Sequence, residues 1–181
     1  MKISPILALG AILLGPTMGP VAAQAPGSPE EAAVDWAVSI VQDSWHKSGA
    51  ISFDRRRVPG MSAFKPGGPD WAASRSDVAI AQLTRRGGGH LRTTDVEKSI
   101  ACTPRGDQPG SSCTMPNPAG FAISEAEASE DGSQVVRVRL WERVDNERWT
   151  RVARREFALT LTRNAEGGWE VADARLIFHA G

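Results

Sequence analysis

Residues 134–144 read QVVRVRLWERV, and this stretch decides the fold. Its apolar side chains fall on one face of an extended chain: Val136, Val138 and Leu140. The side chains between them fall on the opposite face: Arg137, Arg139, Trp141 and Arg143. A repeat of two residues is typical of a β-strand with one face buried in a core. The stretch therefore predicts a half-buried strand.

Three further strands are predicted around this one, at residues 121–129, 149–163 and 169–178. Turns are expected at Asp131-Gly132, at residues 145–147 and at residues 164–168, because glycine and short polar residues favour the backbone angles of tight turns. An irregular phase near Ala153 predicts a bulge or a bend there. Residues 121–178 are thus expected to form an antiparallel meander, and one apolar face of such a sheet needs a cover.

The cover is predicted near the N-terminus, where Ser28-Pro29-Glu30-Glu31 combines a capping serine, a proline at the first helical position and a capping-box glutamate. The helix is expected to run from Pro29 to about Lys47 and to stop at Gly49. Its apolar residues recur at helical spacing: Val34, Val38, Val41 and Trp45. Such a stripe suits a helix that lies across a sheet. A second helix is expected over Asp77–Arg86, capped by Ser76.

Residues 50–120 show fewer sequence patterns that indicate a helix or a strand. The basic run Arg55-Arg56-Arg57 fits either a solvated loop or an anion site. Residues 69–76 are expected to hold a short turn of helix with Trp71 packed inward. A short strand is expected over Ser99–Cys102.

Residues 1–23 are expected to be a signal peptide, since a basic start and an apolar run at 6–14 precede the small residues Val21-Ala22-Ala23. A retained N-terminal anchor helix is the alternative. Residues 24–28 are then a flexible start, and residues 29–181 a single exported α+β domain. The location is expected to be periplasmic or secreted.

Cys102 and Cys113 are expected to form a disulfide, because paired cysteines in an exported chain oxidise by default. A redox pair and metal ligation with a histidine are the alternatives. Their spacing matches neither the two-residue separation of redox motifs nor a zinc motif.

The charge and motif content argue against several classes of function. With 21 basic and 21 acidic residues in 181, the chain is formally neutral, which does not suit a nucleic-acid binder. No segment after the expected signal peptide is apolar enough to span a membrane. His46, His90 and His179 stand at no metal-ligand spacing, and the nucleophile elbow and phosphate-loop patterns are missing. No metal, cofactor or catalytic residue is therefore assigned from the sequence.

A helix followed by a curved antiparallel meander resembles the nuclear transport factor 2-like superfamily, which includes ketosteroid-isomerase-like proteins and has a cone-shaped, cystatin-like arrangement of helix on sheet. The resemblance is carried by the helix 29–47 and by the strand segments 135–141, 157–161 and 167–172. It covers the second half of the chain well and residues 50–120 poorly. It implies an α+β fold with N-terminal helices on a curved antiparallel sheet. The superfamily includes isomerases, cyclases, dehydratases and non-catalytic binding domains, and no catalytic residue maps onto this chain.

The leading functional hypothesis is a non-catalytic exported binding or assembly module. Its partner would be a small apolar ligand or a protein chain, bound on the concave face of the sheet or on its outer face, and the space between helix and sheet is favoured. The candidate pocket residues are Trp36, Trp45, Phe157 and Trp169.

Two alternatives remain open. The first is a small enzyme of the isomerase or hydrolase kind, whose base would have to point into a closed pocket. The candidate bases are Asp35, Asp43, His46 and Asp173. The second is a homodimer formed through the outer sheet face that carries Arg137, Arg139 and Trp141. That face is otherwise expected to be solvated and crossed by ion pairs.

Overall fold

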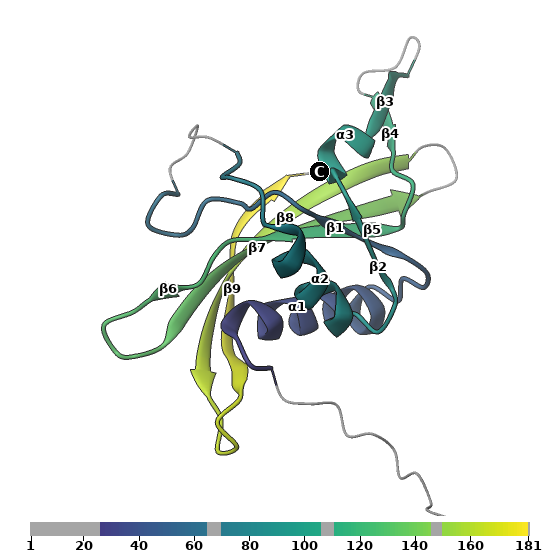
Figure 1. Ribbon diagram of the computed structural model, residues 1–181. Helices are drawn as coiled ribbons and strands as arrows, with labels where there is room; N and C mark the ends of the chain where they lie inside the picture. The colour runs from purple at the N-terminus through teal and green to yellow at the C-terminus, as the bar shows by residue number, and fades with distance from the viewer. Residues whose placement is uncertain (1–25, 65–69, 106–110, 146–149, 181) are drawn as a thin grey trace, which may run out of the picture.

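The computed structural model describes residues 26–64, 70–105, 111–145 and 150–180 (Figure 1). Within these ranges the chain forms one mixed sheet of seven strands, a separate two-stranded hairpin and three α-helices. The helices are α1 (Pro29–Ser39), α2 (Asp77–Arg86) and α3 (Val96–Ser99), and α1 continues as a π-helix over Ile40–Ser44. The strands of the sheet are β1 (Ile51–Asp54), β2 (Leu91–Thr94), β5 (Ala119–Ile123), β6 (Glu127–Ala128), β7 (Gln134–Asp145), β8 (Thr150–Arg163) and β9 (Trp169–Ala180). The hairpin is β3 (Ala101–Pro104) and β4 (Ser111–Thr114).

The expected meander is present as β5, β7, β8 and β9, which pair antiparallel in that order. The sheet as a whole is mixed, so the expectation of a purely antiparallel sheet is wrong. Strand β1 runs parallel to both β5 and β2, in the order β2-β1-β5-β7-β8-β9, because the chain crosses over through α2 between β1 and β2. The short strand β1 is buried along its length and carries none of the alternation that marked the meander.

The turns predicted within the meander are confirmed in part, and its predicted strand bounds and bulge differ from the structure. The turn glycines Gly132 and Gly167 have φ of 82° and 79°, as the predicted turns require. The predicted strand 121–129 is divided into β5 and β6. The bulge expected near Ala153 is wrong: β7 and β8 pair without interruption, and the irregularities lie between β8 and β9, at Glu156/Phe157 and Thr160/Leu161.

Helix α1 lies across the inner face of the sheet, and α2 lies beside α1 (Figure 1). Ser28 caps α1 by accepting from the Glu31 N–H at 3.2 Å, and α2 has the bounds and the Ser76 cap that the sequence predicted. The helix expected to reach about Lys47 ends at Ser44 instead. The inner core contains Phe53, Phe121, Val138, Leu140 and Leu159 from the sheet. Helix α1 contributes Ala33, Val34 and Ala37 to it, and the π-helix contributes Val41. The inner face of β7 is therefore the one that its alternation indicated.

The outer face of the sheet is covered by a stretch that we call the outer segment, residues 55–64 and 70–76. Its two arms pair with each other through an antiparallel bridge between Arg56 and Ser74. A second small core, which we call the outer core, forms between this segment and the sheet from Val58, Val96, Met115, Ala122 and Trp141. Trp71 packs inward, as predicted, but residues 72–75 form no turn of helix.

Residues 1–25 lie outside the described residues, and with them the expected signal peptide at 1–23 and the first residues of the flexible start at 24–28. From Pro26 onward the chain is held to the sheet, because the Pro26 carbonyl accepts the Trp169 N–H at 3.1 Å. Over the ranges that are described, no helix combines the length and apolarity needed to cross a membrane.

Cys102 and Cys113 form the predicted disulfide and stand opposite each other in the β3–β4 hairpin. The strand expected at Ser99–Cys102 begins at Ala101. The hairpin projects from the body of the molecule beside α3, and most of its side chains are exposed (Figure 1). It is attached to β8 where the Ser112 hydroxyl donates to the Thr150 carbonyl and accepts from the Thr150 N–H, at 3.2 and 3.3 Å.

Replacing both cysteines with serine is expected to lower the free energy of unfolding by about 3 kcal/mol, the loop-closure entropy of a loop of this size in the unfolded chain. Amide hydrogens of β3 and β4 should exchange faster while those of β7 keep their relative protection, which hydrogen-exchange mass spectrometry would measure. Reductant should reproduce the effect in the wild type and do nothing to the double variant. Unchanged exchange in the hairpin would contradict the expectation.

Candidate functional site

The four aromatic residues expected to line an apolar pocket instead fill the space between helix and sheet. Trp36 and Phe157 meet edge to face with ring centroids 5.1 Å apart. Trp169 is buried in the inner core, and Trp45 packs against the same core. None of the clefts described below is lined by any of the four. The structure places these four residues in or against the inner core, and a ligand held by them stays a prediction.

The four candidate bases are scattered. Asp43, His46 and Asp173 are exposed, and Asp35 is half-buried and paired with Arg86. Asp35 and Asp43 line a cleft of about 720 Å³ along α1 and α2, which is open to solvent, and His46 borders another cleft with His90. In the described part of the chain, no group of three or more histidines, cysteines and acids is placed to hold a metal ion.

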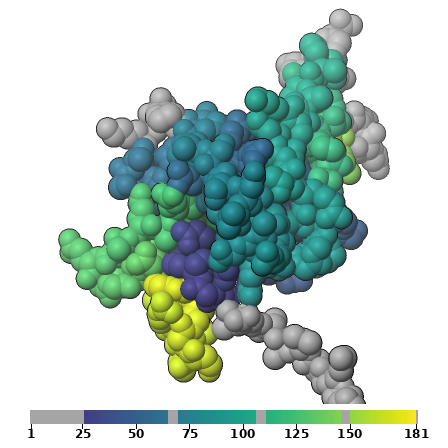
Figure 2. Space-filling model, viewed as in Figure 1, coloured from purple at the N-terminus to yellow at the C-terminus, as the bar shows by residue number. Residues whose placement is uncertain are grey.

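A third cleft, of about 390 Å³, lies where the N-terminal ends of α1 and α2 meet the outer segment and the loop after β5. We call it the helix-end cleft. It is lined by Ser28, Glu30, Arg57, Ser74, Arg75, Ser76, Ala79, Gln82, Leu83 and Glu125. In Figure 2 the purple surface of α1, the teal surface of α2 and the green surface that follows β5 meet in this region.

Local structure explains why these side chains converge. Ser28 and Ser76 are the N-caps of the two helices, so the positive ends of both helix dipoles border the cleft. Arg57 and Arg75 come from the two paired arms of the outer segment, whose backbone hydrogen bonds join Arg75 N to Arg55 O at 3.0 Å and Ala72 N to Arg57 O at 2.8 Å. The two guanidinium groups are thereby held near each other.

Arg75 is the least compensated charge of the cleft. Its Nη2 donates to the carbonyls of Ile123 and Ser124 at 2.9 and 2.8 Å, which fixes the guanidinium against the end of β5. Its Nη1 is buried and finds no hydrogen-bond partner among the described residues, and no described carboxylate comes within ion-pair distance. Burial, with the nearby positive charge of Arg57, lowers the pKa of Arg75 to about 10, although Glu30 acts in the opposite direction.

Three arginines near the helices and in the outer segment, in contrast, have an acidic partner. Arg57 pairs with Glu125 and donates to the Ala73 carbonyl at 2.9 Å. Arg86 pairs with Asp35. Arg56 bridges Asp54 and Asp95 and stacks on Trp71, 3.7 Å from the ring centroid. The basic run at 55–57 is therefore not a solvated loop throughout, because only Arg55 is exposed.

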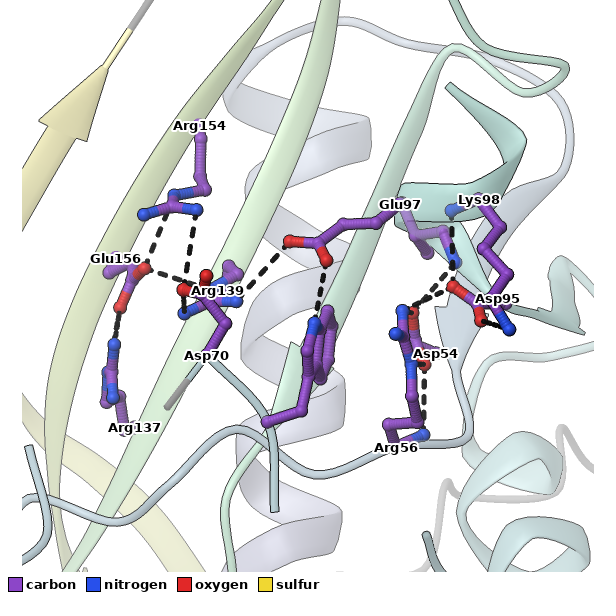
Figure 3. A network of polar contacts seen from close by, with 12 residues as sticks. Asp54, Arg56, Asp70, Asp95, Glu97, Lys98, Arg137, Arg139, Arg154 and Glu156 are labelled. Carbon is purple, nitrogen blue, oxygen red and sulfur yellow. Dashed lines mark hydrogen bonds and ion pairs between the residues drawn. The ribbon is translucent and has the colours of Figure 1, made fainter. Parts of the chain in front are cut away.

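The expected interface residues Arg137, Arg139 and Trp141 lie buried beneath the outer segment, with 3%, 1% and 2% of their surface exposed. The expectation that this face is solvated is wrong for these three residues, and the homodimer stays a prediction. The expected ion pairs are present (Figure 3): buried Glu156 accepts from both Arg137 and Arg139, and Asp70 reaches Arg139 at 3.2 Å. Trp71 stacks on Trp141 with ring centroids 5.9 Å apart. Burial lowers the pKa of Arg139, against the opposing effect of Glu156.

Sequence reasoning missed Arg75, although one signal pointed to it. A cation directly before a helix N-cap faces the positive end of the helix dipole, an unfavourable position unless an anion lies nearby. Ser74-Arg75-Ser76 is such a position. Chemically, the helix-end cleft is lined by a fixed guanidinium whose buried Nη1 has no hydrogen-bond partner among the described residues. A guanidinium is the group that proteins use to hold carboxylates and phosphates.

Comparison of the chain with protein-family models, with curated proteins and with solved structures found no match.

Proposed function

We propose that the protein is an exported, non-catalytic binding module that holds the acidic group of a small ligand at Arg75 in the helix-end cleft. One observation carries the proposal: the Arg75 guanidinium is fixed by two carbonyls, is largely buried, and leaves Nη1 without a partner among the described residues. A buried charge is costly unless an opposite charge or a hydrogen bond compensates for it. A ligand carboxylate or phosphate would supply both.

The surroundings of Arg75 support an anionic group at this point. The starts of α1 and α2 contribute the positive ends of two helix dipoles, and Arg57 lies nearby, although its charge is paired with Glu125. The volume of about 390 Å³ lies in the range of small-molecule sites. The filled space around Trp36 and Phe157 gives no comparable support to an apolar ligand between helix and sheet.

Export is part of the proposal, and the Cys102–Cys113 disulfide supports an oxidising compartment. Membership of the nuclear transport factor 2-like superfamily stays a hypothesis. The helix α1 across the strands β7, β8 and β9 supports it, and the parallel strand β1 is a departure from the expected antiparallel cone.

Binding of acetate, inorganic phosphate and sulfate should be measured by isothermal titration calorimetry at constant ionic strength. At least one of the anions is expected to bind the wild type, and Arg75→Met should weaken that binding about 100-fold, since the contact is charge-assisted and largely desolvated. Because Arg75 must be protonated, affinity should stay level to about pH 9 and fall as the pH rises through about 10.

Arg175→Met is the matched control, because Arg175 is an exposed arginine on β9 and lies outside the cleft. It should bind anions like the wild type. The proposal fails if no anion binds, or if Arg75→Met and Arg175→Met bind equally well. Far-ultraviolet circular dichroism of both variants excludes loss of the fold as the cause of weaker binding, and Arg75→Lys should retain part of the affinity in a folded protein.

A further inference from the structure

The helix-end cleft carries equal numbers of positive and negative groups, but only two of the four form an ion pair with each other. Arg57 and Arg75 supply two positive charges, and Glu30 and Glu125 supply two negative ones. Arg57 and Glu125 neutralise each other directly in an ion pair. Arg75 and Glu30 are the two that remain, and they do not pair with each other. A simple anion would satisfy Arg75 but would leave the Glu30 carboxylate beside it.

Glu30 is held in place at the first turn of α1. Its Oε1 accepts the Ala126 N–H at 3.0 Å, and the residue is half-buried. Its negative charge acts on Arg75 strongly enough to oppose the lowering of the Arg75 pKa, yet the two groups are not within ion-pair distance of each other. The second carboxylate oxygen, Oε2, has no partner among the described residues, so it can accept from a cation in the cleft.

The wall of α2 between the charged groups is apolar. Ala79 and Leu83 lie one turn apart on α2, and both line the cleft. Leu83 is 5% exposed, so the apolar area on offer is small. This wall suits a short aliphatic group and not a long chain or an aromatic ring.

From this arrangement we propose that the ligand is a zwitterionic α-amino acid with a short aliphatic side chain. Its carboxylate binds Arg75, its ammonium binds the free oxygen of Glu30, and its side chain contacts Ala79 and Leu83. This inference rests on the proposed function, since it assigns the ligand class to the same cleft. It also accounts for a cleft that carries as many acids as bases, where a plain anion site would carry an excess of positive charge.

Three compounds that differ by one group each test the inference by calorimetry on the oxidised protein: valine, 3-methylbutanoate, which lacks the amino group, and 2-methylpropylamine, which lacks the carboxylate. Valine is expected to bind at least tenfold more tightly than 3-methylbutanoate, because a carboxylate–ammonium contact in a partly desolvated cleft contributes at least about tenfold in affinity. 2-Methylpropylamine should show no measurable binding.

Glu30→Gln measures the contribution of the Glu30 charge to affinity apart from that of Arg75. Glutamine keeps the carbonyl oxygen that accepts from the Ala126 N–H and removes only the negative charge. It should weaken valine binding about tenfold and leave 3-methylbutanoate binding unchanged or slightly tighter. Glu170→Gln, an exposed acid on β9, is the control and should change neither.

The outcomes distinguish this inference from the proposed function. Equal affinity for valine and 3-methylbutanoate, or an unchanged valine affinity in Glu30→Gln, overturns the zwitterion assignment while Arg75-dependent anion binding stands. If valine, 3-methylbutanoate, acetate, phosphate and sulfate all fail to bind, or bind equally to Arg75→Met, both proposals are overturned.

Discussion

Replacing Glu156 with glutamine is expected to lower the free energy of unfolding by about 3–5 kcal/mol, the usual cost of removing one partner from a buried ion pair. Glu156 is 1% exposed and accepts from Arg137 and Arg139, which are themselves buried beneath the outer segment. Glutamine preserves the shape of the side chain but leaves two buried guanidinium groups without their shared counter-ion. Urea unfolding followed by tryptophan fluorescence measures the change.

The control for this prediction is Glu170→Gln, in which an exposed acid on β9 is neutralised in the same way. It should change the free energy of unfolding by less than about 0.5 kcal/mol. A loss below about 1 kcal/mol for Glu156→Gln would contradict the expectation. The triple variant Arg137→Met, Arg139→Met and Glu156→Leu should recover most of the lost stability, because replacing a whole buried ionic group with apolar residues is often neutral or stabilising.

The alternation of residues 134–144 was enough to assign each face of β7, because a side-chain period of two depends only on local backbone geometry. It could not give the partner of Arg139. A turn centred on residue 146 would place Arg139 opposite Ala153, whereas the structure pairs it with Glu156. Register depends on the turn and on the packing of both strands, so a small error in the turn moves every cross-strand pair.

The burial of the β7 face that carries Arg137 and Arg139 could not be predicted from the sequence, for a different reason. Arg137 and Arg139 alternate with valines as exposed residues do in many antiparallel sheets, and nothing within β7 distinguishes a solvated from a covered face. The cover comes from residues 55–64 and 70–76, which pair with each other and not with the strand that they cover. Such a contact is set by the tertiary fold, and its only sequence signals were the inward Trp71 and the turn-forming residues around it.

The helix-end cleft combines predictable and unpredictable parts. The N-caps Ser28 and Ser76 were both assigned from sequence, since capping is a short-range interaction. That the two helix ends lie together, with Arg75 between them and Glu125 beyond, follows from the crossover between β1 and β2. The four aromatic residues expected at a pocket pack in or against the inner core, because apolar side chains at a helix–sheet interface pack against each other unless something holds them apart.

Replacing Trp141 with alanine is expected to lower the free energy of unfolding by about 3–5 kcal/mol, because it removes the largest side chain of the outer core and leaves a cavity. Trp141 is 2% exposed, packs with Val58, Val96 and Met115, and stacks on Trp71 at an interplanar angle of 14°. The outer segment should loosen as well, since Trp71 loses its partner. Chemical denaturation gives the stability, and hydrogen exchange of the backbone at 56–58 and 72–75 reports the loosening.

This prediction also separates a core role for Trp141 from an interface role. A core residue acts within one chain, so the unfolding midpoints of the wild type and the variant should not depend on protein concentration. If Trp141 formed a dimer interface, the wild-type midpoint would rise with concentration and the alanine variant would lose that dependence. Leu176→Ala, at an exposed apolar residue of β9, should cost less than about 0.5 kcal/mol and serves as the surface control.

The effects of Trp141→Ala and Glu156→Gln on stability should not be additive, because Arg139 lies beside Trp141 and also binds Glu156. The free energy of unfolding lost in the double variant should therefore differ from the sum of the two single losses. The losses of Trp141→Ala and Leu176→Ala should add.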